Sequence, residues 1–202
     1  MTKLPTTMKH FLSGIALALG LFVGTLPAHA AESAKVELMK SGADVRDQAS
    51  LQRGARLFFN YCVGKFQEPV VSHMPAALAG TWFGKAPPDL SLEVDAKGAD
   101  WVYTYLNTFY LDPKSPIGWN NTTLPNAAMP FPLWELQGMQ TAQMKPAKDG
   151  EAAGVEKLVL SHPGKMTPAQ FQQATRDLTS FLQYVSEPAA LQRHHYGIWV
   201  LL

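Results

Sequence analysis

The stretch that most constrains the fold is an apolar helical face that leads to the only cysteine of the chain. Five residues recur at i, i+4, i+7, i+8 and i+11, which is one face of an α-helix: Leu51, Ala55, Phe58, Phe59 and Cys62. The spacing predicts a helix over 50–62. Ser50 is its expected N-cap, because a serine hydroxyl can accept a free backbone N–H of the first turn. The helix would end with Cys62 on its apolar side.

A single cysteine limits the redox chemistry of the chain. Cys62 cannot form an intrachain disulfide, so it is a free thiol, half of an intermolecular bridge, or an attachment point. A catalytic thiolate would need a neighbouring base, and no histidine motif stands beside Cys62. A catalytic role for Cys62 is therefore the weakest interpretation of this residue.

The first 30 residues have the pattern of a secretory signal. Lys3, Lys9 and His10 form a basic head, an apolar run covers 11–26, and Ala28-His29-Ala30 has the small-x-small form of a cleavage site. The alternative is a membrane anchor, although the run is at the short end of the ~17–25 residues that span a bilayer. We predict a signal peptide over 1–30, export of the chain, and a single domain over 31–195.

The charge balance argues against one class of partner. The chain carries 17 basic and 16 acidic residues, and removal of Lys3 and Lys9 with the leader reverses the excess. No basic surplus indicates nucleic-acid binding, and no block of like charge indicates a tail.

Two further helices follow from their own patterns. A broad aromatic stripe of Trp101, Tyr105 and Phe109 predicts a helix that opens at Asp100 as N-cap and serves core packing. Thr167 and Gln170 form a capping box that predicts a helix over 167–186.

The segments between these helices are expected to be loops and short strands. Pro87 and Pro88 predict a rigid extended loop over 82–91, because proline lacks a backbone N–H. The long loop over 113–133 contains Met129, and loops of this length are mostly functional. Residues 133–139 read as a short strand or extended segment, and 155–160 as a strand.

These residues together resemble the cytochrome c1 family, the haem subunit of the bacterial ubiquinol–cytochrome c reductase (bc1) complex. The matching runs occur in family order: RGARLFFNYC (53–62), WFGKAPPDLS (82–91), GADWVYTYL (98–106), GWNN (118–121) and AAMPFPLWELQG (127–138). The resemblance implies a mainly α fold, that of a c-type cytochrome domain with long irregular loops. It also implies a location on the periplasmic side of the inner membrane, with a C-terminal helix as anchor.

The resemblance assigns roles to four residues. Cys62 matches the first thioether cysteine, Met129 matches the methionine ligand of the haem c iron, and Pro87 and Pro88 match the loop beside the haem. The family partners are cytochrome b, the iron–sulfur subunit and a soluble cytochrome c. The family passes electrons from the iron–sulfur subunit to that cytochrome, with no side-chain catalysis.

The attachment motif departs from the family. Haem attachment uses Cys-x-x-Cys-His, whereas this chain reads Cys62-Val63-Gly64-Lys65-Phe66. The segment over 66–82 is also expected to be shorter than in the family, and His73 is the nearest replacement ligand, although a solvated loop histidine is the simpler interpretation. We therefore predict impaired electron transfer and doubtful haem attachment, with a haemless structural or assembly subunit, or a deletion product, as the alternative.

The last seven residues, 196–202, combine Tyr196 and Trp199 with an apolar run, as at the entrance to a membrane helix. They are too few to span a bilayer, which needs ~20 residues. We expect them to be the start of a truncated anchor.

Overall fold

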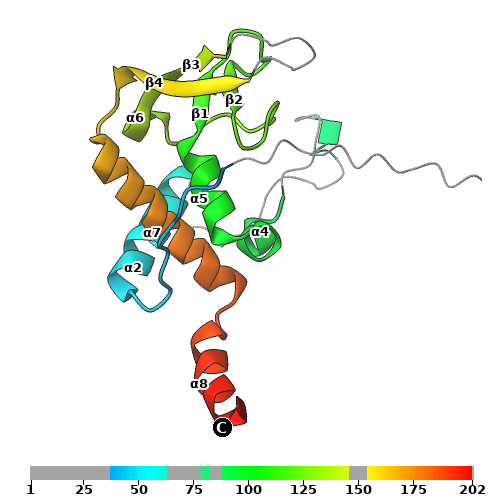
Figure 1. Cartoon of the computed structure of the whole chain (residues 1–202), viewed down its shortest axis with the longest axis vertical. Helices are drawn as coiled ribbons and strands as arrows, with labels where there is room; N and C mark the ends of the chain where they lie inside the picture. Colours follow the sequence, from blue (N-terminus) through cyan, green and yellow to red (C-terminus); the bar gives the residue numbers. More distant parts are fainter. Residues whose placement is uncertain (1–36, 63–77, 79, 82–87, 146–153, 202) are drawn as a thin grey trace, which may run out of the picture. The chain divides into compact units, whose positions relative to one another are not determined.

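The computed structural model describes residues 37–62, 78, 80, 81, 88–145 and 154–201 (Figure 1). The chain divides into two compact units, Met1–Lys35 and Val36–Leu202, and every described residue belongs to the second unit. The predictions for the leader, for Lys65, Phe66 and His73, and for Pro87 lie outside the described residues.

Helix α7, Pro168–Ser186, is the element on which other helices pack. Helices α2 (Gln48–Tyr61), α4 (Leu90–Lys97) and α5 (Ala99–Asn107) all contact it (Figure 1). The predicted capping box is confirmed: Gln170 N–H donates to Thr167 Oγ1, and Thr167 N–H donates to Gln170 Oε1. Four apolar residues of α7 are buried: Phe171, Ala174, Leu178 and Leu182.

Helix α2 begins earlier than predicted, and Ser50 is not its N-cap. Asp47 caps the helix, because its Oδ1 accepts the Ser50 N–H at 3.1 Å. The Ser50 hydroxyl instead donates to Asp177 Oδ1 of α7 at 2.7 Å. A carboxylate ahead of the predicted cap has taken the capping role, which leaves the serine to join two helices.

A close backbone contact brings α2 and α7 together. Gly54 is buried in α2, and a Cβ at this position would overlap the backbone carbonyl of Asp177 and the Phe181 side chain. Small residues allow helix backbones to approach more closely than side chains would permit. Gly54 therefore sets the spacing of this helix pair.

The region over 88–109 differs from its predicted secondary structure at three places. Helix α4 occupies part of the predicted extended loop, because Asp89 caps it by accepting the Ser91 N–H at 2.9 Å. Helix α5 begins after Gly98, whose φ of +90° suits glycine, and Asp100 lies in its first turn. Phe109 is not helical, since α5 ends at Asn107 and Phe109 begins strand β1.

A small sheet lies beside the N-terminal end of α7 (Figure 1). Its strands are β1 (Phe109–Leu111), β2 (Trp119–Asn121), β3 (Gly138–Met144) and β4 (Val155–Pro163), in the order β2-β1-β3-β4. The β1–β2 and β3–β4 pairs are antiparallel, and β1 and β3 are parallel.

The sheet modifies the predicted fold class. The strand expected at 155–160 is confirmed, but a short helix, α6 (Trp134–Gln137), occupies most of the segment expected to be extended at 133–139. About half of the described residues are helical. The prediction of a mainly α fold is therefore confirmed only in part.

Helix α8, Ala190–Leu201, follows α7 and contains the residues expected to begin an anchor. Its Tyr196, Trp199 and Val200 side chains are exposed. Within the part of the chain that the structure describes, no helix combines the length and apolar character needed to cross a membrane.

Candidate cofactor site

Cys62 is the residue that caps the C-terminus of α2. Its backbone N–H donates to the Phe58 carbonyl at 2.8 Å, and the residue is exposed. The helix ends at Tyr61, one residue earlier than predicted, and Cys62 is its C-cap, with a helical backbone conformation.

The Cys62 thiol is a poor nucleophile. Although the residue retains contact with solvent, desolvation of the thiol raises its pKa to about 11. The thiol is then protonated at neutral pH, whereas the thiolate is the reactive form. This further weakens the interpretation of Cys62 as a catalytic group.

Pro88 is exposed and lies directly before Asp89, the cap of α4. No described contact joins Pro88 to Met129 or to Cys62. Of the two prolines predicted to lie beside the haem, Pro87 and Pro88, the structure describes Pro88.

Met129 lies in the loop between β2 and α6 and is half-buried. It packs at the edge of the hydrophobic core, beside buried neighbours in sequence, Ala127 and Phe131. A thioether in this position is a soft ligand for a transition metal. The methionine part of the predicted site is therefore held against the folded core.

Aromatic side chains form the core beside this loop. Trp101 stacks on Tyr105 with ring centroids 5.2 Å apart, and Phe109 stacks on Phe131 at 4.7 Å. Tyr105 meets Phe109 edge to face at 4.9 Å, which joins the two stacks. The expectation that the aromatic stripe serves core packing is confirmed, with Phe109 contributing from a strand.

Tyr105 does not act as a base in this cluster. Burial, reinforced by the nearby Glu93 charge, raises its pKa to about 12. The phenol therefore remains neutral across the physiological range, and its contribution is apolar contact.

The described residues contain no group of three or more His, Cys, Asp or Glu that could hold a metal ion. His162 is exposed on β4, where its Nδ1 lies 3.4 Å from Ser161 Oγ. His194 and His195 lie in α8. No described contact joins His162 to Met129.

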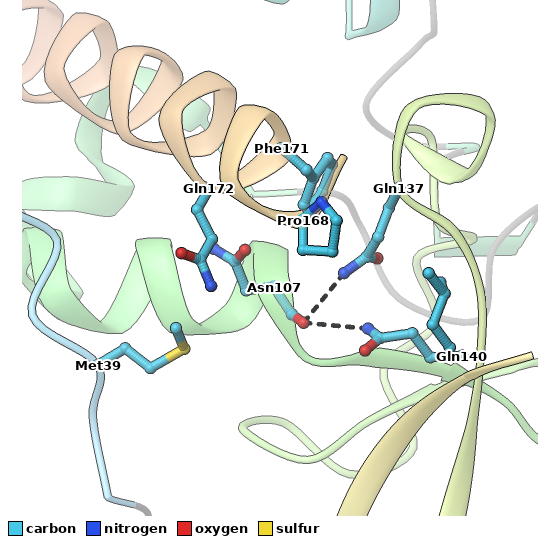
Figure 2. Close-up of a pocket in the computed structure, with 8 residues that line it drawn as sticks. Met39, Asn107, Gln137, Gln140, Pro168, Phe171 and Gln172 are labelled. Carbon is cyan, nitrogen blue, oxygen red and sulfur yellow. Dashed lines mark hydrogen bonds between the residues drawn. The ribbon is translucent and has the colours of Figure 1, made fainter. Parts of the chain in front are cut away.

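A cavity of about 140 Å³ lies elsewhere, between α7, the end of α5 and strand β3 (Figure 2). The Asn107 carbonyl accepts hydrogen bonds from Gln137 Nε2 at 3.3 Å and from Gln140 Nε2 at 3.2 Å. The cavity is lined by neutral residues: Met39, Asn107, Gln137, Gln140, Leu160, Pro168, Phe171 and Gln172. It is smaller than the ~300–1,000 Å³ of typical ligand sites, and it contains no acid, base or thiol.

The sequence did not identify Asn120 and Asn121 as part of the site. Both are buried in β2, ahead of the Met129 loop, and their side chains bond to the backbone of that loop. The available signal was a pair of asparagines inside a long loop that also contains the predicted ligand. Asparagine side chains commonly replace backbone partners in such turns.

Comparison with known proteins identifies the family. The model of the cytochrome c1 family matches residues 63–202. Cytochrome c1 of Allochromatium vinosum is 36% identical, with 82% of this chain and 81% of that protein covered. A protein of Nitrosomonas europaea named "Ammonia monooxygenase gamma subunit" is 35% identical, with coverage of 92% and 88%.

The fold and these matches define a domain of the kind that carries haem in electron transfer. The chain belongs to the cytochrome c1 family.

The relatives contain residues that this chain lacks. The alignment with the Nitrosomonas protein runs over 217 residues, more than the 202 residues of this chain. Positions inside that alignment must therefore have no counterpart here. The alignments do not assign these positions, but their existence agrees with the expected shortening over 66–82.

The residues present do not fit a haem held as the family holds it. Two thiols and a histidine are needed at the attachment motif, and the chain has Cys62 followed by Lys65 and Phe66. Cys62 is exposed, and His162, the histidine whose side chain the structure describes, makes no described contact with the Met129 loop. The predicted methionine ligand, Met129, packs at the core edge, and the attachment motif is incomplete.

Proposed function

We propose that this chain is a cytochrome c1-type subunit whose electron transfer is impaired. In the family role, electrons pass from the iron–sulfur subunit of the bc1 complex to a soluble cytochrome c through haem c. Two observations carry the proposal. The predicted ligand Met129 packs at the edge of the core, but Cys62 is the only cysteine of the chain, whereas the attachment motif needs two.

The proposed cofactor residues are Cys62, Pro87, Pro88 and Met129, with Met129 as the metal ligand. When bound, haem c supplies the redox chemistry, and the protein contributes burial and the axial ligand. No side chain of this chain is assigned acid–base or nucleophilic catalysis.

The second candidate is a haemless subunit that contributes structure or assembly. It is favoured by the same incomplete motif, because such a role needs the fold but not the cofactor. The relative named as a subunit of a monooxygenase also supports a role within a larger complex. The proposed partners remain cytochrome b and the iron–sulfur subunit.

Assembly and electron transfer can be separated in one experiment. The tagged chain is produced in a bacterium that has the other bc1 subunits but lacks its own cytochrome c1. We expect the tag to recover cytochrome b and the iron–sulfur subunit, with quinol–cytochrome c reductase activity strongly reduced. Residual activity that Met129→Leu abolishes supports the impaired carrier, and a complex without activity supports the structural subunit. Full activity, or failure to recover any subunit, contradicts the proposal.

We also propose export to the periplasmic side of the inner membrane, with cleavage after residue 30. The basic head and the Ala28-His29-Ala30 sequence support it. N-terminal sequencing should recover a chain that begins near Ala31, and an intact Met1 would contradict cleavage. The proposed domain covers 31–195, and we propose that 196–202 begins an anchor.

A further inference from the structure

We propose that Asn120 and Asn121 are positioning residues that fix the Met129 loop without a cofactor. The methionine side of the site then keeps its geometry in a chain whose attachment side is incomplete. The role of Met129 as a haem ligand rests on the proposed function. The hydrogen bonds of the two asparagines do not, because they are contacts within the chain. We refer to these two asparagines as the asparagine clamp.

Asn121 is the inner half of the asparagine clamp and is fully buried. Its Oδ1 accepts the backbone N–H groups of Thr123 at 2.8 Å and Leu124 at 3.1 Å. Its Nδ2 donates to the Tyr105 carbonyl of α5 at 2.8 Å. One side chain therefore joins the start of the loop to the helix of the aromatic stack.

Asn120 is the outer half of the clamp. Its Oδ1 accepts the Asn121 N–H and the Asn126 N–H, both at 2.8 Å. Its Nδ2 donates to Asp112 Oδ2, also at 2.8 Å. The bond to Asn126 closes the loop on itself six residues further along the chain.

The closed turn leads directly to Met129. Asn126 has a φ of +60°, a left-handed conformation that asparagine tolerates better than most residues. Ala127 follows, buried, with its N–H donating to the Leu124 carbonyl at 3.2 Å. On the other side of Met129, Phe131 is buried between Phe109 and Trp119. The loop is thus held on both sides of the thioether.

The partners of the clamp are separate from the attachment motif. Among the residues that the structure describes, the hydrogen-bond partners of Asn120 and Asn121 all lie within 105–126. Loss of the second cysteine and of the histidine removes none of these bonds. The two sides of the site can therefore fail independently.

The test uses the full chain with ¹³C-labelled methionine methyl groups, observed by NMR without added haem. Met129→Leu assigns the Met129 signal, and Met166, which also packs on the core, reports the integrity of the fold. In Asn121→Ala, the Met129 signal should shift to the position of unfolded methionine or broaden, while Met166 remains in place.

Asn107→Ala is the matched control, because Asn107 is a second asparagine with tertiary hydrogen bonds but lies outside the loop. It should perturb Met39, which lines the same cavity, and leave Met129 unchanged. If Asn121→Ala unfolds the chain and moves Met166, Asp112→Ala takes its place, because it removes the outer anchor of Asn120 and an exposed bond to the Lys114 N–H, and leaves every bond of Asn121 in place. Met129 must then shift.

Three results would overturn the clamp. They are an unchanged Met129 signal in folded Asn121→Ala or in Asp112→Ala, a Met129 shift as large in Asn107→Ala, and an unfolded Met129 position in the unmodified chain. None depends on haem or on bc1 partners. A failed assembly experiment and a failed clamp are therefore distinguishable.

Discussion

At the scale of single residues, Cys62 separates this chain from the family pattern most sharply. A thioether-bonded cysteine has no free thiol, whereas the Cys62 environment stabilises the protonated thiol. Its chemistry therefore reports directly on whether the attachment side has formed.

We expect iodoacetamide to alkylate Cys62 with a rate that rises with pH to a midpoint of about 11 in the folded chain. In denaturant the midpoint should fall to about 8.5, the value of an unperturbed thiol. Mass spectrometry after timed quenching gives both profiles. A folded-state midpoint equal to the denatured one would contradict the desolvated environment, and complete resistance in denaturant would indicate a thiol that is already bonded.

Asp177 is the second residue of consequence, because it joins α7 to α2. Its side chain is 3% exposed, and it accepts hydrogen bonds from Arg53 Nε at 2.6 Å and from Ser50 Oγ at 2.7 Å. Burial acts to raise the pKa of Asp177, but hydrogen bonds from Arg53, Ser50 and Gln173 outweigh it, so the pKa lies below its usual value.

The lowered pKa predicts an acid-dependent loss of stability. A carboxyl group with a lowered folded-state pKa stabilises the fold above its unfolded pKa of about 3.9 and loses that contribution as pH falls further. Asp177→Asn should lower the free energy of unfolding by about 1–3 kcal/mol at pH 7. It should also reduce the fall in stability below pH 4. Urea unfolding at several pH values measures both, and an unchanged acid slope would contradict the role of Asp177.

At the scale of elements, the α2–α7 contact depends on Gly54. Gly54→Ala places a methyl group against the Asp177 backbone, which cannot move without displacing α7. We expect a loss of about 1–3 kcal/mol or more in the free energy of unfolding, as for overpacked cores. Gly197→Ala is the control, because a Cβ there meets no atom within 4 Å. Equal stability of the two variants in urea would contradict the close contact.

The elements also show what the sequence could predict. The helix over 168–186 was predictable, because its cap, its first proline and its apolar stripe all indicate the same segment. Strands β1 and β2 were not, since they have three residues each and their pairing depends on the intervening turn at 112–118. Ser50 and Asp100 have favourable capping side chains, but tertiary partners, Asp177 and Lys40, take those groups.

The sequence could predict the residues of the candidate site that act through their own side-chain chemistry. Met129 and Cys62 could be proposed from the motif runs. The asparagine clamp could not, because its function comes from bonds to backbone groups that only the folded loop brings together. The end of the helix was predicted to within one residue, since Cys62, expected to be its last residue, is its C-cap.

At the scale of the whole molecule, the chain has a cytochrome c1-family domain in which the proposed haem site keeps Met129 and lacks part of the attachment motif. The helices, the aromatic core and the methionine loop are held by contacts within the chain. The attachment motif has lost two of its three chemical groups. The central claim is therefore that the fold is retained while covalent haem attachment is lost.

The pyridine haemochrome spectrum of the purified chain, produced with a cytochrome c maturation system, tests this claim most directly. We predict little or no c-type signal per chain from the unmodified protein. The Lys65→Cys, Phe66→His double variant should recover only part of it, because the segment after the motif remains short. A stoichiometric c-type signal from the unmodified chain would contradict the account.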